Sequence, residues 1–194
     1  MADVTGIIRL LGLSSKLKNT MRHDYTSTGR NESVADHSWR LALLVFIIAP
    51  YLESSIDTTK AIKMALIHDI VEAVTGDIPY FRATGCKHKN ELKAMDALRQ
   101  TLGDEAFKMI YHLWIEYEQQ ETNEAKIVKA LDKIEAQIQQ NEAGFATWLP
   151  VEKADALSGE RLFLYSRFDK MLLALAEATV SESRELANCS ALKS

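Results

Sequence analysis

Two histidines and two aspartates from three separate segments of the chain have the side-chain types that bind a divalent cation. They are His37, His68, Asp69 and Asp132. Borderline ions such as Mn²⁺, Co²⁺, Fe²⁺ and Zn²⁺ accept mixed nitrogen and oxygen ligands of this kind. Four protein ligands can leave coordination positions open for water and substrate, so the set indicates catalysis as well as binding.

The first of these residues is expected near the start of a helix. Ser33 and Asp36 have the spacing of a capping box, in which each side chain accepts a hydrogen bond from the other residue's backbone N–H. Such a box predicts a helix that carries His37 in its first turn and ends near Pro50.

The His68-Asp69 pair is expected within a helix over about residues 61–74, which stops at Gly76. In that helix Glu72 would lie one turn after His68, with Cβ atoms about 5–6 Å apart. Glu72 would then reach the edge of a bound cation without having to bind it. That is where a general acid or base for a water molecule belongs.

The same pair allows a simpler interpretation, because a lone histidine at an apolar helix position is more often a hydrogen-bonded core residue than a ligand. A buried Asp69 beside His68 changes this balance, since an unpaired carboxylate in a core costs on the order of several kcal/mol. We therefore expect a cation beside the pair. His37 and Asp132 as further candidate ligands favour a metal.

The rest of the chain is also predicted to be helical. Only 3 prolines occur, and no stretch alternates apolar and polar residues as a strand would. Further helices are expected over about residues 4–16, 89–101, 104–120, 123–142 and 156–178. Residues 19–31 and 77–87 are expected to be loops, and the tail after residue 181 is expected to fray. The predicted fold is one all-α domain.

The composition is that of an ordinary soluble domain of 194 residues, with 47% apolar residues and a net charge of −4. This charge argues against a surface that binds a nucleic acid polymer. The longest apolar run, residues 41–50, is too short to span a membrane, and no signal peptide is evident. Two cysteines far apart in the chain, Cys86 and Cys189, favour a reducing compartment, so a cytoplasmic protein is expected.

The candidate ligands and their neighbours resemble the HD domain, a helical family of metal-dependent phosphohydrolases. The resemblance extends to the 5′-deoxynucleotidase branch of that family and covers about residues 4–145. It is carried by Arg22, Glu32-Ser-Val-Ala-Asp-His37-Ser, His68-Asp-Ile-Val-Glu72-Ala-Val-Thr-Gly-Asp77-Ile-Pro79 and Glu124-Ala-Lys-Ile-Val-Lys-Ala-Leu-Asp132. The extension from Glu72 to Asp77 is much more specific than the His-Asp pair alone.

The resemblance implies an all-α helical bundle of the HD-domain type over residues 1–180, with 181–194 as the frayed tail. It also implies one divalent cation (Mn, Co, Fe, Zn or Mg), a nucleotide as the small-molecule substrate and a homodimer. The cation would be bound by His37, His68, Asp69 and Asp132. The implied activity is hydrolysis of 2′-deoxynucleoside 5′-monophosphates to deoxynucleoside and phosphate.

The resemblance also implies roles for residues around the metal. Glu72, counted as catalytic together with the metal ligand Asp69, would handle the proton of the attacking water. Arg22 would hold the 5′-phosphate, because a guanidinium offers a fork of donors to phosphate oxygens. Asp77 would accept a hydrogen bond from a hydroxyl of the deoxyribose.

The residues expected to contact the base of the substrate are the ones that differ most from the family pattern. An aromatic residue commonly follows the arginine within one or two positions there, whereas this chain has Arg22-His23-Asp24-Tyr25. Either His23 or Tyr25 is therefore expected to supply the surface on which the base stacks.

Three alternatives stay open. His88 and His112 could belong to a second metal, but His88 lies in a basic loop and His112 in an apolar stretch, so a single metal is preferred. The substrate could be another phosphoester, such as a nucleoside triphosphate, a cyclic nucleotide or a small phosphomonoester. The chain could also be a helical regulatory or assembly module with a structural metal, although such a module has no need of Glu72.

Overall fold

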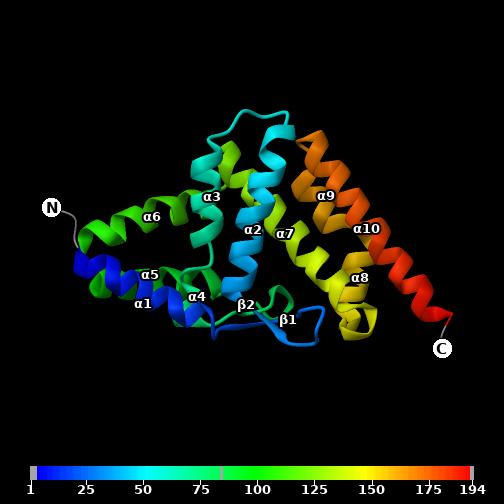
Figure 1. Ribbon diagram of the computed structural model, residues 1–194, viewed down its shortest axis with the longest axis horizontal. Coiled ribbons are helices and arrows are strands. Elements are labelled where there is room, and N and C mark those ends of the chain that lie inside the picture. The colour runs from blue at the N-terminus through cyan, green and yellow to red at the C-terminus, as the bar shows by residue number, and fades with distance from the viewer. Residues whose placement is uncertain (1–3, 84, 193–194) are drawn as a thin grey trace.

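Helices form nearly all of the fold, as predicted, and a single short hairpin interrupts them in the part of the chain that the structure describes. The structure is a computed structural model that describes residues 4–83 and 85–192 (Figure 1). In chain order the elements are α1 (Val4–Leu17), β1 (Met21–Tyr25), β2 (Asn31–Ser33), α2 (Val34–Ile48), η1 (Ala49–Tyr51), α3 (Thr58–Ile67), α4 (Glu72–Thr75), η2 (Tyr80–Arg82), α5 (Lys87–Leu102), α6 (Asp104–Gln119), α7 (Asn123–Ala143), η3 (Phe145–Thr147), α8 (Pro150–Ser158), α9 (Glu160–Ser166) and α10 (Lys170–Ala191).

Helix α7 is the centre of the architecture, because it packs against α2, α3, α6, α9 and α10 and also against β1. Its apolar side chains, among them Ile127, Leu131 and Ile134, are fully buried in the larger of two core clusters. A second cluster joins α1, α5 and α6, the three helices that lie together in Figure 1, with Ile70 and Val71. Burial of each such side chain stabilises the fold by about 1.5–3 kcal/mol. The core thereby fixes the position of any polar residue that α7 carries.

The start of α2 is as the sequence predicts. Ser33 Oγ accepts from the backbone N–H of Asp36 at 3.1 Å, and Asp36 Oδ2 accepts from the backbone N–H of Ser33 at 2.9 Å. This capping box places His37 in the first turn, and the helix ends at Ile48, near Pro50. The prediction for this segment is confirmed.

The continuous helix predicted over residues 61–74 is wrong. Helix α3 ends at Ile67, and α4 begins only at Glu72. Between them the backbone hydrogen bonds run from residue i to i−3, as from Ile70 to Ile67, and not to i−4. His68 and Asp69 therefore lie in a tight turn between two helices, and Glu72 is the first residue of the second helix. The predicted stop at Gly76 is confirmed.

Residues 19–31, predicted to be a loop, contain most of a β-hairpin. Strands β1 and β2 pair antiparallel, and the hairpin turns through Gly29, whose φ of 83° lies in the left-handed region. Most β1 side chains are half-buried, and the strand packs against α7. The hairpin holds Arg22 and His23 at a fixed place beside α7.

The single C-terminal helix predicted over residues 156–178 is also wrong. Gly159 ends α8 with a φ of 73°, and a Cβ at that position would come within 2.7 Å of the Phe163 ring. Asp169 then caps α10 by accepting from two backbone N–H groups. Helix α10 continues to Ala191, beyond its predicted end, and Ser183, in the segment expected to fray, is fully buried. Within the described residues, no helix is both long and apolar enough to cross a membrane.

Candidate active site

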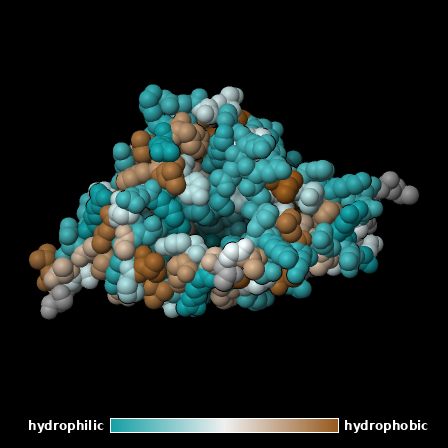
Figure 2. Space-filling view, turned by 180° about the vertical axis from the view of Figure 1, so that it is seen from behind, coloured by the Kyte–Doolittle hydropathy of each residue, from teal (hydrophilic) through white to brown (hydrophobic). Residues whose placement is uncertain are grey.

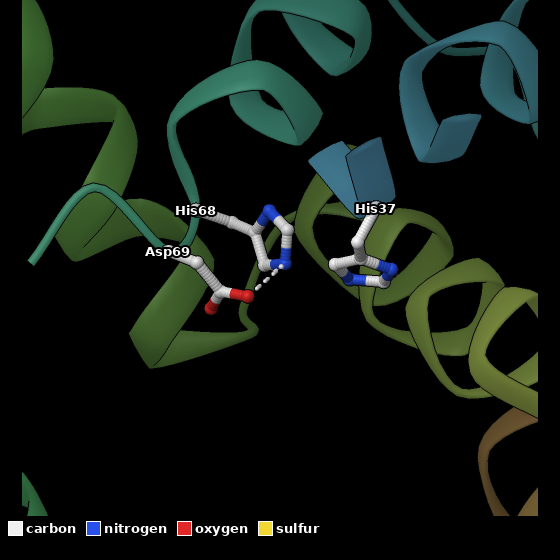
Figure 3. Close-up of side chains that lie close together, drawn as sticks. All are labelled: His37, His68 and Asp69. Carbon is white, nitrogen blue, oxygen red and sulfur yellow. Dashed lines mark ion pairs between the residues drawn. The ribbon is translucent and has the colours of Figure 1, made fainter. Parts of the chain in front are cut away.

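The structure brings the four predicted metal ligands together. His37 comes from the first turn of α2, and His68 and Asp69 come from the turn after α3 (Figure 3). One ligand atom from each of these three residues lies within 4.8 Å of the other two. Asp132 Oδ1, on α7, lies 3.2 Å from His37 Nε2 and 4.0 Å from His68 Nε2. Two nitrogens and two carboxylates therefore meet at one place.

An oxygen atom next to Nδ1 sets the orientation of each imidazole ring. His68 Nδ1 lies 2.8 Å from the Ala65 carbonyl oxygen, to which it donates, and His37 Nδ1 contacts a carboxylate oxygen of Glu135. Both Nε2 atoms therefore point toward Asp132, and neither has a hydrogen-bond partner among the described residues. Two buried nitrogens that make no hydrogen bond, each in contact with a carboxylate oxygen, are a donor set that fits a divalent cation.

Asp69 differs from the expectation of a buried carboxylate. Its side chain is 23% exposed, and Oδ2 lies 2.9 Å from His68 Nε2. An aspartate with one side open can bind a cation and still leave space for water or a substrate beside it.

The charges around the candidate ligands favour the protonated imidazole of His37 and the ionised carboxylate of Asp132. Burial and the charge of Arg22 lower the pKa of His37, but Glu135 and Asp132 outweigh both and raise the pKa of His37 to about 10. Burial would raise the pKa of Asp132, yet Lys133 and the two imidazoles hold that pKa well below its usual range. His37 therefore holds its proton tightly, and a metal ion would have to compete with that proton for the site.

A cavity of about 140 Å³ opens beside His68, Asp69 and Asp132, whereas His37 is fully buried and does not line it. The face of the molecule opposite to that in Figure 1 is hollowed near its middle, and hydrophilic residues surround much of the hollow (Figure 2). Of the residues predicted for the site, the cavity is lined by Arg22, His23, His68, Asp69, Glu72, Asp77 and Asp132. Segments more than a hundred residues apart in the sequence thus share one pocket.

Tyr25 lies outside this cavity. It lines a neighbouring hollow of only about 10 Å³, with Trp148 and Gln140. His23, by contrast, lines both cavities, and its ring packs edge-on against Phe81 with 5.7 Å between centroids. The expectation that Tyr25 offers a stacking surface is therefore not supported by its position, whereas His23 is suitably placed.

Glu72 is a buried carboxyl group with an unusual pKa. Burial and the charges of Asp69 and Asp77 outweigh Arg22 and Lys87, and together they raise the pKa of Glu72 to about 10. Its Oε2 has no hydrogen-bond partner among the described residues. A carboxyl of this kind can hold a proton at neutral pH, and a cation nearby would lower its pKa again.

Arg22 and Asp77 present opposite charges to the cavity. Burial lowers the pKa of Arg22, but Glu32, Asp24 and Asp77 raise it above its ordinary value, so the guanidinium stays charged. Burial also raises the pKa of Asp77, and Arg22 opposes that shift. The pocket thus offers a cation and a hydrogen-bond acceptor at two of its walls.

Several lining residues were not predicted from the sequence. Tyr117 Oη donates to Asp132 Oδ2 at 2.9 Å, and Lys133 Nζ donates to the same oxygen at 2.9 Å. Tyr117 and Glu118 belong to the end of α6, a segment whose acidic composition is typical of a solvated helix end. The signal in the sequence is that Tyr117 follows the aromatic Trp114 by three residues, which puts both on one face of the helix, and both are buried.

His88 and His112, considered as ligands of a second metal, are both exposed. His88 Nδ1 lies 3.6 Å from Glu118 Oε2 at the cavity rim. His88 lies in the first turn of α5 and not in a loop, and it forms a separate group with Glu91 and Glu118 that could hold a metal; neither histidine belongs to the group of His37, His68 and Asp69.

Comparison with known proteins identifies the family. A family profile described as HD domain matches residues 14–161. The chain belongs to the HD-domain family. Both the predicted family and the predicted all-α fold of the HD-domain type are confirmed.

Among its relatives, the HD-domain chain is 35% identical over 141 residues to a Mus musculus protein named 5′-deoxynucleotidase HDDC2, which covers 71% of this chain and 69% of that protein. It is 34% identical over 142 residues to the Schizosaccharomyces pombe 5′-deoxynucleotidase hdd1, with 69% and 70% covered. A solved structure from Magnetospirillum magnetotacticum, described as a predicted metal-dependent phosphohydrolase, has a TM-score of 0.77 and 30% identity, with 94% of this chain and 95% of that chain covered.

Proposed function

We propose that this protein is a metal-dependent 5′-deoxynucleotidase that hydrolyses 2′-deoxynucleoside 5′-monophosphates to deoxynucleosides and phosphate. The observation that carries the proposal is the convergence of the four candidate ligands, three of which (His68, Asp69 and Asp132) line a cavity together with Arg22, Glu72 and Asp77, while His37 lies buried behind them. The relatives named 5′-deoxynucleotidase, at about a third identity over two thirds of their length, support the same activity.

His37, His68, Asp69 and Asp132 would hold one divalent cation, either Mn, Co, Fe, Zn or Mg. Such a cation, when bound, lowers the pKa of water, polarises a phosphoryl oxygen and orients the substrate. The two unpartnered Nε2 atoms and the half-buried Asp69 support this assignment.

Arg22 would bind the phosphate. Its guanidinium is largely buried, and Nε lies 2.9 Å from Glu32 Oε2. The side chain also lines the cavity. A guanidinium held in this way loses little freedom when it binds phosphate oxygens, and it stabilises negative charge that develops during hydrolysis.

Glu72 would take the proton of the attacking water. The raised pKa of Glu72 shows that its buried environment disfavours the carboxylate when the cation is absent. A cation beside Asp69 would offset that repulsion and leave Glu72 poised between its two protonation states near neutral pH, which suits proton transfer.

Asp77 would accept a hydrogen bond from a sugar hydroxyl, and His23 with Phe81 would form the wall against which the base packs. All three residues line the cavity beside Tyr80.

The protein is also proposed to be a cytoplasmic homodimer. Cys86 and Cys189 are both free and exposed, which suits a reducing compartment.

The solvent-facing side of α2 carries an apolar stripe of Trp39, Leu43 and Phe46, whose exposed fractions are 63%, 41% and 62%. A second copy that packs its own stripe against this one would bury both. Phe46→Glu should convert a dimer to a monomer in light scattering.

The activity is tested by phosphate release from matched deoxy- and ribonucleoside 5′-monophosphates, first in chelator and then with Mn²⁺, Co²⁺, Mg²⁺ or Zn²⁺ added. Metal-dependent release from the deoxy series alone is expected. Release from triphosphates or cyclic nucleotides instead would identify another phosphohydrolase. Absence of release with every metal and substrate would favour a helical module with a structural metal.

A further inference from the structure

A pair of buried carboxylates lies behind the site, on the side away from the cavity. Glu32 and Glu135 are each 1% exposed, and neither lines the cavity. An oxygen of each lies within 4.8 Å of the other and of a nitrogen of His37. We propose that this pair positions the two parts of the active site: Glu135 orients the metal ligand His37, and Glu32 orients the phosphate ligand Arg22. The inference rests on the metal and phosphate roles proposed above.

The carboxylates of Asp132 and Glu135, which contact the two nitrogens of the His37 ring, both come from α7. Asp132 and Glu135 are three residues apart, so both side chains lie on one face of that helix. Asp132 faces Nε2 of the ring, and Glu135 contacts Nδ1. A carboxylate at Nδ1 keeps the proton on that nitrogen, so that Nε2 is the nitrogen available to a metal. The ring is also prevented from turning over.

Glu32 makes the matching contact to the phosphate ligand. Its Oε2 lies 2.9 Å from Nε of Arg22, while Nη2 of Arg22 lies 3.4 Å from Asp24 Oδ2. Glu32 belongs to β2 and Arg22 to the paired strand β1, so the contact crosses the hairpin. With Nε beside Glu32 and Nη2 beside Asp24, the guanidinium of Arg22 is fixed where it lines the cavity.

The same three residues, Glu32, His37 and Glu135, could be taken for a second metal site, but the local charges argue against it. Arg22 lies on Glu32, and Arg40 Nε lies 3.5 Å from Glu135 Oε1. Each of the two carboxylates already faces a guanidinium group, which would repel a divalent cation placed between the carboxylates. The role that remains for the carboxylates is to hold their neighbours.

Substitution of Glu135 and substitution of Glu32 should therefore have different effects, the first on metal affinity and the second on phosphate affinity. Glu135→Gln should weaken binding of Zn²⁺ or Mn²⁺ by about 10–100-fold, the usual effect of removing a carboxylate behind a histidine ligand. Glu32→Gln should leave metal affinity within about twofold and weaken binding of inorganic phosphate about tenfold, the equivalent of one charge-assisted hydrogen bond.

The experiment measures the two affinities separately. Metal affinity is determined without phosphate, by competition with a chelating indicator, and inorganic phosphate affinity is determined in chelator, by calorimetry. Glu142→Gln is the matched control, because Glu142 is a half-exposed carboxylate of α7 that pairs with Arg40 at 2.6 Å but is not in the group around His37. It should change neither affinity.

Nitrogen-15 spectra of the imidazole rings in the Zn²⁺-loaded protein give a readout that does not depend on activity. The His37 signals, assigned by their loss in His37→Gln, should show a protonated Nδ1 and a metal-bound Nε2. Metal bound through Nδ1, or Glu135→Gln with wild-type metal affinity, would overturn the role of Glu135. Equal loss of both ligands in both variants would show that the pair acts only through the fold. A wild-type protein that binds no divalent cation would overturn the proposed metal site and this inference together.

Discussion

Replacement of Glu72 by glutamine should stabilise the metal-free protein at neutral pH while it removes catalysis. Glu72 is buried, and its pKa is raised to about 10 by burial and by the charges of Asp69 and Asp77. In the unfolded chain its pKa is the ordinary value of about 4.3. Folding at pH 7 therefore requires the carboxylate either to take up a proton or to be buried with its charge, and both cost free energy.

The size and sign of this effect follow from the raised pKa. A group whose pKa is higher in the folded state favours folding most below the unfolded pKa, and this contribution is lost as pH rises toward the folded pKa. Each pH unit in that window is worth about 1.4 kcal/mol. Between about pH 4.5 and pH 7.5 the wild-type protein should lose up to about 4 kcal/mol relative to Glu72→Gln, whose amide does not titrate.

The assay is urea unfolding of both proteins in chelator at several pH values from about 5 to 8. The difference in unfolding free energy should grow with pH in favour of Glu72→Gln, and added Zn²⁺ should reduce it because the cation stabilises the ionised carboxylate. Glu142→Gln, a half-exposed change on α7, should show no such slope. Two parallel curves of stability against pH for wild type and Glu72→Gln would refute the reasoning.

Other changes should separate the remaining roles. Asp69→Ala should abolish metal binding and phosphate release together, as measured by metal content and turnover, since it removes a ligand; an active variant would exclude Asp69 from the site. Arg22→Ala should weaken inorganic phosphate binding and lower kcat/KM while metal content stays at the wild-type level, and unchanged kinetics would remove Arg22 from the substrate site. Ser33→Ala should lower the free energy of unfolding by about 1 kcal/mol through loss of the helix cap, measured by urea titration, and no change would mean that the capping box does not stabilise α2.

The parts of the site that could be predicted from the sequence are those with local causes. The capping box of Ser33 and Asp36 fixes the start of α2 within four residues, so the place of His37 is readable from the chain. The spacing of His68, Asp69 and Asp132 within a recognisable pattern indicates the ligand set without any knowledge of the packing.

The features that could not be predicted depend on contacts between distant residues. Glu135 meets His37 across 98 positions of the sequence, and no local pattern distinguishes it from a solvated carboxylate. The break of the helix at His68 is not visible either, because the surrounding residues keep a helical apolar pattern. Strand β1 is short and rich in charged residues, so it lacks the alternation by which strands are recognised.

The central place of α7 has a consequence for the order in which the protein can acquire its metal during synthesis. His37, His68 and Asp69 precede α7 in the chain, whereas Asp132 and the Glu135 that contacts His37 lie within it. A nascent chain that has not yet released α7 therefore has three of the four proposed ligands and lacks the Glu135 carboxylate that contacts His37. Metal loading should follow the packing of α7 against α2 and α3, so that an occupied site marks a chain whose core is already assembled.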